Sequence, residues 1–140
     1  MTLSKRHLLH AFLITGTVAL VGCSKIQPVR PLVNQPIPDG LTTQQIQHDI
    51  RSAGIQRQWV INSVKPGVME GRLDWRSYYV DVEIPYTKTS YSILYKNSAN
   101  LNYHNGEIHR AYNKWVTMLN RDIQAQFAIT TTKMAPEKAK

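Results

Sequence analysis

The spacing of apolar residues changes twice along the chain between residues 41 and 127. Helical spacing comes first, alternation of apolar and polar residues follows, and helical spacing then returns. A repeat of about 3.6 residues indicates a helix with one buried stripe, whereas a repeat of two indicates a strand with one buried face. The pattern therefore predicts an α+β domain in the order α-β-β-β-β-α.

The first helix is predicted to begin after Leu41. Thr42 can cap its N-terminus, and Gln45, three residues later, completes a capping box. The apolar stripe of this helix then consists of Ile46, Ile50 and Ala53. Gly54 is expected to follow the helix as its C′ residue, with Ile55 folding back on the last turn.

Four strands are predicted next, over about 58–64, 68–75, 78–84 and 91–95. Pro66-Gly67 suits a type II turn, Arg76-Ser77 can close the second hairpin, and residues 87–90 can close the third. In this register apolar residues meet apolar residues across the strands: Leu73 and Val80, Met69 and Ile84, Ile84 and Ile93, and Val82 and Tyr95. Arg72 falls opposite Asp81 on the other face. One face of the antiparallel meander is therefore apolar and needs a cover.

A second helix, over about 107–127, can supply that cover. Asn105-Gly106 marks its start, and Glu107 suits the positive end of the helix dipole. Its apolar side consists of Ile108, Ala111, Tyr112, Trp115, Val116, Leu119, Ile123 and Phe127. The expected fold is a four-stranded antiparallel meander sheet with an N-terminal and a C-terminal helix packed on one face.

The N-terminus has the features of an export signal. Lys5 and Arg6 precede an apolar run over 8–20, which is too short to span a bilayer. The run ends in Leu20-Val21-Gly22-Cys23, which resembles a bacterial lipobox. The resemblance implies that the Cys23 thiol receives a diacylglyceryl group and that the peptide before it is removed. The alternative is an ordinary signal peptide, or an uncleaved anchor, with a cysteine nearby by chance.

The residues after the lipobox suggest a location and a spacer. Ser24 stands where Gram-negative lipoproteins kept at the inner membrane usually carry an aspartate, so the resemblance implies a lipid-anchored, periplasm-facing protein of the outer membrane. Prolines without strand or helix periodicity favour an extended tether before the domain. The chain is thus divided into a leader over 1–22, a lipidated cysteine with a proline-rich tether over 23–40, a domain over 41–128 and a disordered basic tail over 129–140.

Charge and cysteine content add two limits. The chain carries 17 Lys and Arg residues against 9 Asp and Glu residues, but the basic residues are spread along the sequence. This basicity could favour anionic headgroups, and it is weak evidence for nucleic acid, which an exported protein is not expected to meet. Cys23 is the only cysteine, so its lipidation would leave no thiol for disulfides or metal binding.

The later half of the chain is similar to a family of small, functionally uncharacterised proteobacterial lipoproteins. The residues that carry the resemblance are Tyr91-Ser92-Ile93, Tyr95, Ser98, Asn100-Leu101, Tyr103, Ile108-His109, Tyr112-Asn113, Trp115-Val116 and Leu119. The family also shows a tryptophan after the first helix (Trp59 here), a Pro-Gly turn and alternating strands. The resemblance covers roughly residues 41–127 and supports the domain limits and the compartment, but it implies no known activity.

Five polar residues of that run form a candidate site: Ser98, Asn100, Tyr103, His109 and Asn113. They lie in the last loop and at the start of the second helix, where His109 and Asn113 are four residues apart and share one predicted helix face. One interpretation is a small ligand site beside aromatic rings. The other is a loop tied to a helix start by side-chain hydrogen bonds, as Ser and Asn commonly form.

Trp59 and Ile61 are harder to place. The Pro66-Gly67 register puts Val60 and Val64 with the core and sends Trp59 and Ile61 to the charged face. Either the first strand contains a bulge, or these two side chains form an apolar patch suited to a partner surface. A third possibility is that Trp59 folds over the sheet edge against the first helix.

No catalytic, metal or cofactor site is predicted. His104 and His109 are five residues apart, off the spacing of a helical metal pair, and no serine sits in a nucleophile elbow. The sequence thus favours a non-enzymatic accessory or protein-interaction module of the cell envelope with an unidentified envelope partner. The alternative is a module that binds a small ligand, lipid or glycan in a cleft between the second helix and the sheet, lined by Tyr95, Tyr103, His109 and Tyr112.

Overall fold

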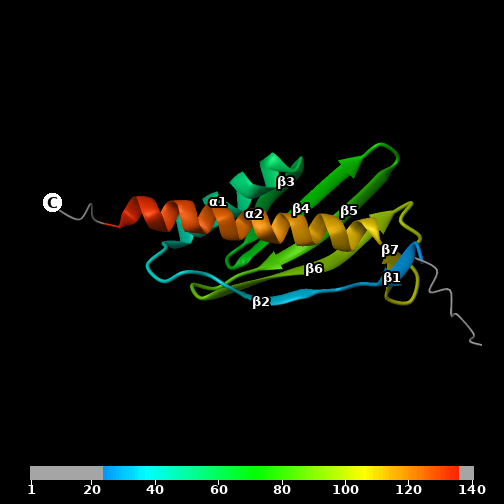
Figure 1. Cartoon of the computed structure of the whole chain (residues 1–140), viewed down its shortest axis with the longest axis horizontal. Helices are drawn as coiled ribbons and strands as arrows, with labels where there is room; N and C mark the ends of the chain where they lie inside the picture. Colours follow the sequence, from blue (N-terminus) through cyan, green and yellow to red (C-terminus); the bar gives the residue numbers. More distant parts are fainter. Residues whose placement is uncertain (1–23, 136–140) are drawn as a thin grey trace, which may run out of the picture.

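A computed structural model describes residues 24–135 as one α+β unit. Its elements, in chain order, are β1 (Ile26–Pro28), β2 (Leu32–Pro36), α1 (Thr43–Gln56), β3 (Trp59–Lys65), β4 (Val68–Trp75), β5 (Tyr78–Pro85), β6 (Ser90–Ala99), β7 (Glu107–His109) and α2 (Ala111–Met134). Five strands form an antiparallel sheet in the order β2-β6-β5-β4-β3, and β1 pairs with β7 beside it (Figure 1). The α+β class is therefore confirmed.

The prediction of four strands is wrong because the proline-rich segment supplies another. Residues 24–40 contain β1 and β2, and β2 pairs with β6 at the edge of the sheet, with Leu32 opposite Ile93. Proline is compatible with an edge strand, whose outer N–H groups need no partner in the sheet. A bulge between Leu32 and Gln35, with Asn34 at a φ of 52°, removes the alternation that would reveal the strand.

The second helix begins and ends later than predicted. Asn105 and Gly106 both have positive φ, 47° and 79°, and His104 and Glu107 exchange two backbone hydrogen bonds across them. This geometry closes a tight hairpin, for which Asn-Gly is the strongest short sequence signal. Residues 107–109 are consequently β7 rather than helix. At the other end α2 includes 129–134, part of the stretch expected to be a disordered tail.

The predicted start of helix α1 is confirmed, but its predicted end is wrong. The Thr42 side chain accepts a hydrogen bond from the Gln45 N–H, and the Gln45 side chain accepts one from the Thr42 N–H, as in a capping box. Gly54, however, lies within the helix, and Ile55 is exposed. A Cβ atom at Gly54 would come within 2.5 Å of the Ile61 Cδ1 atom. Glycine is needed here because α1 packs closely on β3.

Four of the five predicted pairs form between β4 and β6, where the register of β5 and β6 also shifts between Asp81 and Val82. Leu73 pairs with Val80, Met69 with Ile84, Arg72 with Asp81, and Val82 with Tyr95. Both helices cover the apolar face that these strands share, and the edge-on contact between the Tyr91 and Phe127 rings joins β6 to α2. On the free edge of the sheet, the Arg51 side chain donates a hydrogen bond to the Ile61 carbonyl.

Strand β3 contains the bulge that one interpretation required. The pairing with β4 shifts between Ser63 and Lys65, so Trp59 and Ile61 enter the core and each is 2% exposed. Val60 and Val64 face outward instead, at 64% and 50% exposure. The interpretation that Trp59 and Ile61 form an exposed patch on the charged face is therefore wrong.

Apolar spacing puts two tryptophans on core-facing sides, Trp75 by its alternation with Leu73 and Trp115 in the stripe of the second helix, but both lie at the margin of the core. Trp115 is partly buried against the core, and Trp75 is 46% exposed at the end of β4. Between residues 24 and 135, neither helix combines the length and apolarity required to cross a membrane.

Candidate functional site

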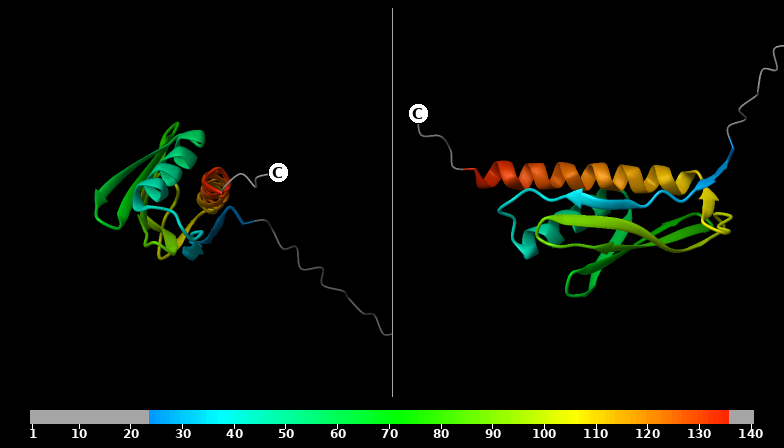
Figure 2. Two further views of the ribbon diagram at one scale, coloured as in Figure 1. Left: turned by 90° about the vertical axis from the view of Figure 1, so that its left-hand side faces the viewer. Right: turned by 90° about the horizontal axis from the view of Figure 1, so that it is seen from below.

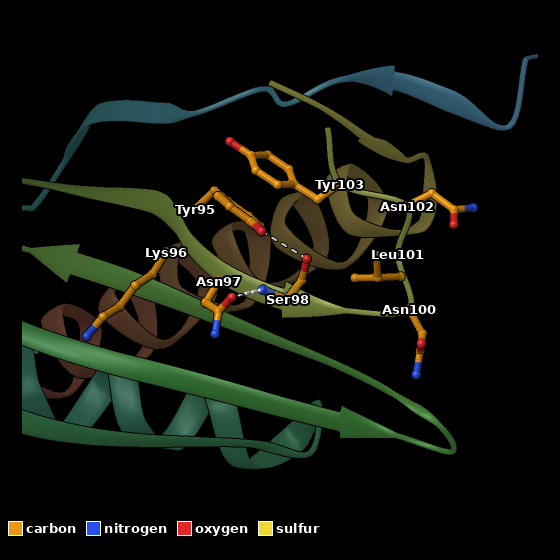
Figure 3. A pocket seen from close by; sticks show the side chains of 8 residues that line it. All are labelled: Tyr95, Lys96, Asn97, Ser98, Asn100, Leu101, Asn102 and Tyr103. Atoms are coloured by element: carbon orange, nitrogen blue, oxygen red, sulfur yellow. Dashed lines mark hydrogen bonds between the residues drawn. The ribbon is translucent and has the colours of Figure 1, made fainter. Parts of the chain in front are cut away.

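The structure does not bring the five predicted polar residues together. Ser98, Asn100 and Tyr103 line an open hollow whose wall is a single continuous segment, residues 95–103 (Figure 3). There the Tyr95 ring stacks on the Tyr103 ring with centroids 4.3 Å apart, and the Tyr95 and Ser98 hydroxyls lie 2.9 Å apart. Asn100 points away from the tyrosine pair, and its Nδ2 donates to the Ser77 carbonyl at 2.5 Å.

His109 and Asn113 lie elsewhere and have local structural partners. His109 belongs to β7, so the two residues do not share a helix face, and the His109 Nδ1 accepts a hydrogen bond from the Ala111 N–H. The Asn113 side chain is 7% exposed, and it accepts from the Arg30 N–H and donates to the Pro28 carbonyl. His109 thus bonds to the start of α2, as a loop tied to that helix start would, whereas Asn113 ties α2 to the N-terminal segment and not to the last loop.

The cleft expected between the second helix and the sheet does not form around the four predicted residues. Tyr95 and Tyr103 share the open hollow, but His109 and Tyr112 are not part of its wall. Tyr112 is fully buried, with its ring edge-on to Tyr95 at 5.6 Å. Burial raises the pKa of the Tyr112 hydroxyl well above its ordinary value.

All three tryptophans of the chain instead line one groove, which we call the tryptophan groove. Trp59 comes from the start of β3, Trp75 from the end of β4 and Trp115 from α2. The remaining residues of the groove are Arg57, Gln58, Leu73 and Met118. Three separate elements therefore converge here, at one end of the sheet, around a volume of about 280 Å³.

Local backbone and close packing position the floor of the groove. Arg57 and Gln58 make up the whole connection between α1 and β3, and Gln58 has a φ of 63°. The chain reverses in this short link, which places Trp59 at the start of β3, in the groove that Trp115 and Met118 of α2 also line. A Cβ atom at Gly54 would lie 3.4 Å from the Trp59 Cβ, and one at Gly71 would lie 3.5 Å from the Trp59 ring. Trp59 is thus held on both sides as a rigid, nearly buried floor.

The rim of the groove carries one ion pair and one cation over an aromatic ring. The Arg57 Nε lies 2.5 Å from the Asp122 Oδ2, and this hydrogen bond raises the pKa of Arg57. The ion pair ties the C-terminus of α1 to α2. The Arg76 guanidinium lies 5.9 Å from the centre of the Trp75 ring, within the range of a cation–π contact.

No family model matches the chain, and a search of curated proteins finds no match. The fold and the groove define an α+β domain whose single layer of helices meets the sheet at a cluster of indole rings.

Sequence reasoning missed the groove because it assigned Trp59 to the outer face and Trp75 and Trp115 to the core. The positions of the three tryptophans in the predicted elements could have indicated the groove. Trp59 and Trp75 stand at the two strand ends that a β3–β4 hairpin brings together, and Trp115 lies on the helix predicted to cover them.

Proposed function

We propose that the protein is a lipid-anchored, periplasm-facing interaction module of the cell envelope, and that it binds a partner protein by taking an apolar side chain into the tryptophan groove. The observation that carries the proposal is the convergence of three indole rings on one groove, with Trp75 46% exposed. Exposed apolar area costs about 25 cal/mol per Å², and tryptophan is the residue most enriched among the energetic centres of interfaces.

The size of the groove favours a protein side chain over a free ligand. Small-molecule sites usually enclose about 300–1,000 Å³. The groove, at about 280 Å³, lies at the lower limit of that range and opens between α2 and the sheet. The centre of a protein interface usually consists of one anchoring side chain in a pocket, and the contacts around the pocket exclude water. The proposal assigns the protein no catalytic activity and no cofactor.

The membrane anchor is the second part of the proposal. Cys23 lies outside the residues that the structure describes, and the support for its acylation is the lipobox sequence with the basic and apolar stretch before it. The resemblance to small proteobacterial lipoproteins and the residue at position 24 support an outer-membrane location. An anchored module meets partners in the same membrane at a raised effective concentration, so a small interface can suffice.

Photo-crosslinking in the full-length chain tests the groove. A photoreactive residue at Met118, within the groove, should crosslink to an apolar stretch of one envelope protein. A photoreactive residue at Ala125, an exposed position further along α2, should not. The crosslink at Met118 should disappear with Trp75→Ser and persist with Val60→Ser, which removes a more exposed apolar side chain, 64% against 46%, from the opposite face of the sheet.

Two results would overturn this proposal. Equal crosslinking from positions 118 and 125 would show contact without a specific site, and a crosslink that survives Trp75→Ser would place the contact outside the groove. Unchanged melting of the Trp75→Ser variant shows that any loss is local.

A further inference from the structure

Basic residues that are dispersed in the sequence gather on one side of the folded domain. We define the basic face as five exposed residues: Lys25, Arg30, Arg110, Lys114 and Arg121. Lys114 and Arg121 lie two turns apart on α2, Arg110 is its N-cap residue, and Arg30 lines the same long surface groove. The Arg110 N–H donates a hydrogen bond to the Lys25 carbonyl at 2.7 Å, which brings Lys25 to the start of that row.

The charges of the basic face have no partners within the domain. Among residues 24–135, none of the five forms an ion pair, and no acidic side chain lines their groove. The acidic Asp122 of α2 is already bound to Arg57, and Glu107 lies on β7 outside this groove. A row of cations without acidic neighbours creates a positive surface potential, which attracts anions.

The opposite side of the molecule has the opposite character. The outer face of the sheet carries Glu70, Asp74, Asp81 and Glu83. Its two central cations are engaged there: Arg72 lies 3.0 Å from Asp74 and 3.2 Å from Asp81, and Lys96 pairs with Glu70. Because both helices cover the other face of the sheet, the fold separates a basic side from a side whose cations are neutralised.

The chain enters the domain at the basic face. Cys23 directly precedes Ser24, and β1 begins at Ile26. Strand β1 is held by its pairing with β7, and β1 lies at the N-terminal end of α2 (Figure 2). The three residue steps from Cys23 to Ile26 span at most about 11 Å of extended chain, so little spacer separates the lipobox cysteine from the folded domain.

We propose that the basic face rests on anionic phospholipid headgroups, with the acidic outer face of the sheet turned away from the membrane. The proposal rests on the membrane anchoring of the proposed function and does not require a partner in the tryptophan groove, although Trp115 and Met118 line both grooves. Anionic lipid surfaces attract clusters of Lys and Arg placed next to an anchor, and a basic patch is a common second membrane signal beside acyl chains. The anchor holds the domain at the surface, and the basic face sets its orientation.

Headgroup quenching in the full-length, membrane-purified protein tests the orientation. Single cysteines for a fluorescent label are introduced as Thr117→Cys, within the groove of the basic face, and as Asn62→Cys, on the outer face of the sheet. The protein is reconstituted in phosphatidylcholine vesicles with or without phosphatidylglycerol, both containing a lipid with a spin label on its headgroup. The parent chain, with Cys23 alone, controls for label at the lipobox cysteine.

We expect several-fold stronger quenching at position 117 than at position 62 in the vesicles that contain phosphatidylglycerol. The difference should shrink without that lipid and in 1 M NaCl, because the screening length falls from about 10 Å at 0.1 M salt to about 3 Å at 1 M. The double variant Lys114→Glu with Arg121→Glu should abolish the difference in quenching between positions 117 and 62. Lys65→Glu with Lys88→Glu makes the same change in net charge away from the basic face and should leave it intact.

The outcomes separate the two proposals. Labelling of the parent chain, or loss of the protein from floated vesicles in 1 M NaCl, would contradict the anchor. Two results would overturn the docking of the basic face in protein that stays on the vesicles. One is equal quenching at positions 117 and 62, and the other is the same quenching with and without phosphatidylglycerol. If the charge-reversed variant melts early, Lys114→Gln with Arg121→Gln replaces it, and unchanged quenching in that variant would likewise overturn the proposal.

Discussion

The side-chain oxygen of Asn113 accepts a hydrogen bond from the backbone N–H of Arg30 at 3.0 Å, across 83 residues of sequence. The same side chain donates to the Pro28 carbonyl at 2.9 Å. One buried amide on α2 therefore satisfies two backbone groups of the segment that leads out of the lipobox. This is how a proline-rich stretch becomes a fixed part of the domain rather than a spacer.

Loss of that amide should release the segment. We expect Asn113→Ala to lower the free energy of unfolding by about 1–3 kcal/mol, because two buried backbone groups lose their partners. Hydrogen exchange should quicken at Val29 and Arg30, whose N–H groups are bonded in the parent. Lys114→Ala, at the exposed neighbouring position, should change stability by less than about 0.5 kcal/mol. Unchanged exchange at both amides would show that β1 is held by its pairing with β7 alone.

Two aromatic residues of α2 should differ in their contribution to stability. Phe127 is fully buried against Tyr91, so Phe127→Ala should cost about 3–5 kcal/mol in a denaturant melt. Trp115 is a helix-stripe residue by pattern but only partly buried, and Trp115→Ala should cost distinctly less. Equal losses in the two variants would place Trp115 in the core and leave the tryptophan groove without its α2 wall.

Gly54→Ala should destabilise the protein although it adds a better helix former. In an open helix this change gains about 1 kcal/mol, but the new Cβ would lie 2.5 Å from the Ile61 Cδ1. Overpacking of this kind costs about 1–3 kcal/mol. Ile61→Val removes the Cδ1 atom, so the double variant should lose less than the two single changes together. Strict additivity in this double-mutant cycle would contradict the contact.

Two buried tyrosines should make the protein sensitive to alkaline pH. Burial raises the pKa of Tyr91 from 10.0 to about 12, while a hydrogen bond donated by Gln124 opposes the shift. A folded pKa above the unfolded value means that stability is complete below about pH 10 and falls as the pH rises from about 10 to about 12. Denaturant melts across that interval should show the fall.

Phenylalanine variants separate the two tyrosines. Tyr91→Phe should reduce the alkaline loss but lower the neutral-pH stability by about 1–2 kcal/mol, because Asn120 loses the hydroxyl that donates to it at 2.7 Å. The Tyr112 hydroxyl is buried and has no hydrogen-bond partner among residues 24–135. Tyr112→Phe should therefore be neutral or stabilising. A loss of more than about 1 kcal/mol there would reveal a partner for that hydroxyl.

The lipobox makes a prediction that is independent of the fold. Cys23→Ser should block acylation and leave the precursor unprocessed at this site. Metabolic labelling with a palmitate analogue should label the parent chain and not the variant. Undiminished label in the Cys23→Ser variant would contradict lipidation at this residue.

Local rules predicted the parts of the fold that depend on near neighbours. The capping box at Thr42 and Gln45 and the pairing of Arg72 with Asp81 follow from spacings of a few residues, and both are confirmed. Asn105-Gly106 is also a local signal, but it suits both a helix start and a type I′ hairpin. Because a helical pattern follows, the sequence predicted a helix start at this position, whereas the structure has a hairpin.

The remaining features depend on residues far apart in sequence. Strand β2 pairs with β6 some 60 residues later, and its prolines and its bulge conceal the strand pattern. The bulge in β3 turns Trp59 inward and Val60 outward. The alternation of apolar and polar residues does not show where such a bulge lies. Apolar spacing also does not separate a core position from a rim position, so it could not predict that Trp75 and Trp115 open onto a groove. The basic face is equally hidden, because Arg30 and Arg110 meet only in the folded chain.

The pairing of β1 with β7 also bears on the order of folding. Ile26 lies opposite His109, so the first strand of the chain cannot find its partner until all the other strands have been synthesised. Contacts of such long sequence separation form late, because the loop between them must first be closed by other structure. We expect the central hairpins of β3 to β6 to assemble first. The segment next to Cys23 would join them in the final steps, so that the domain closes onto the stretch that would link it to the proposed anchor.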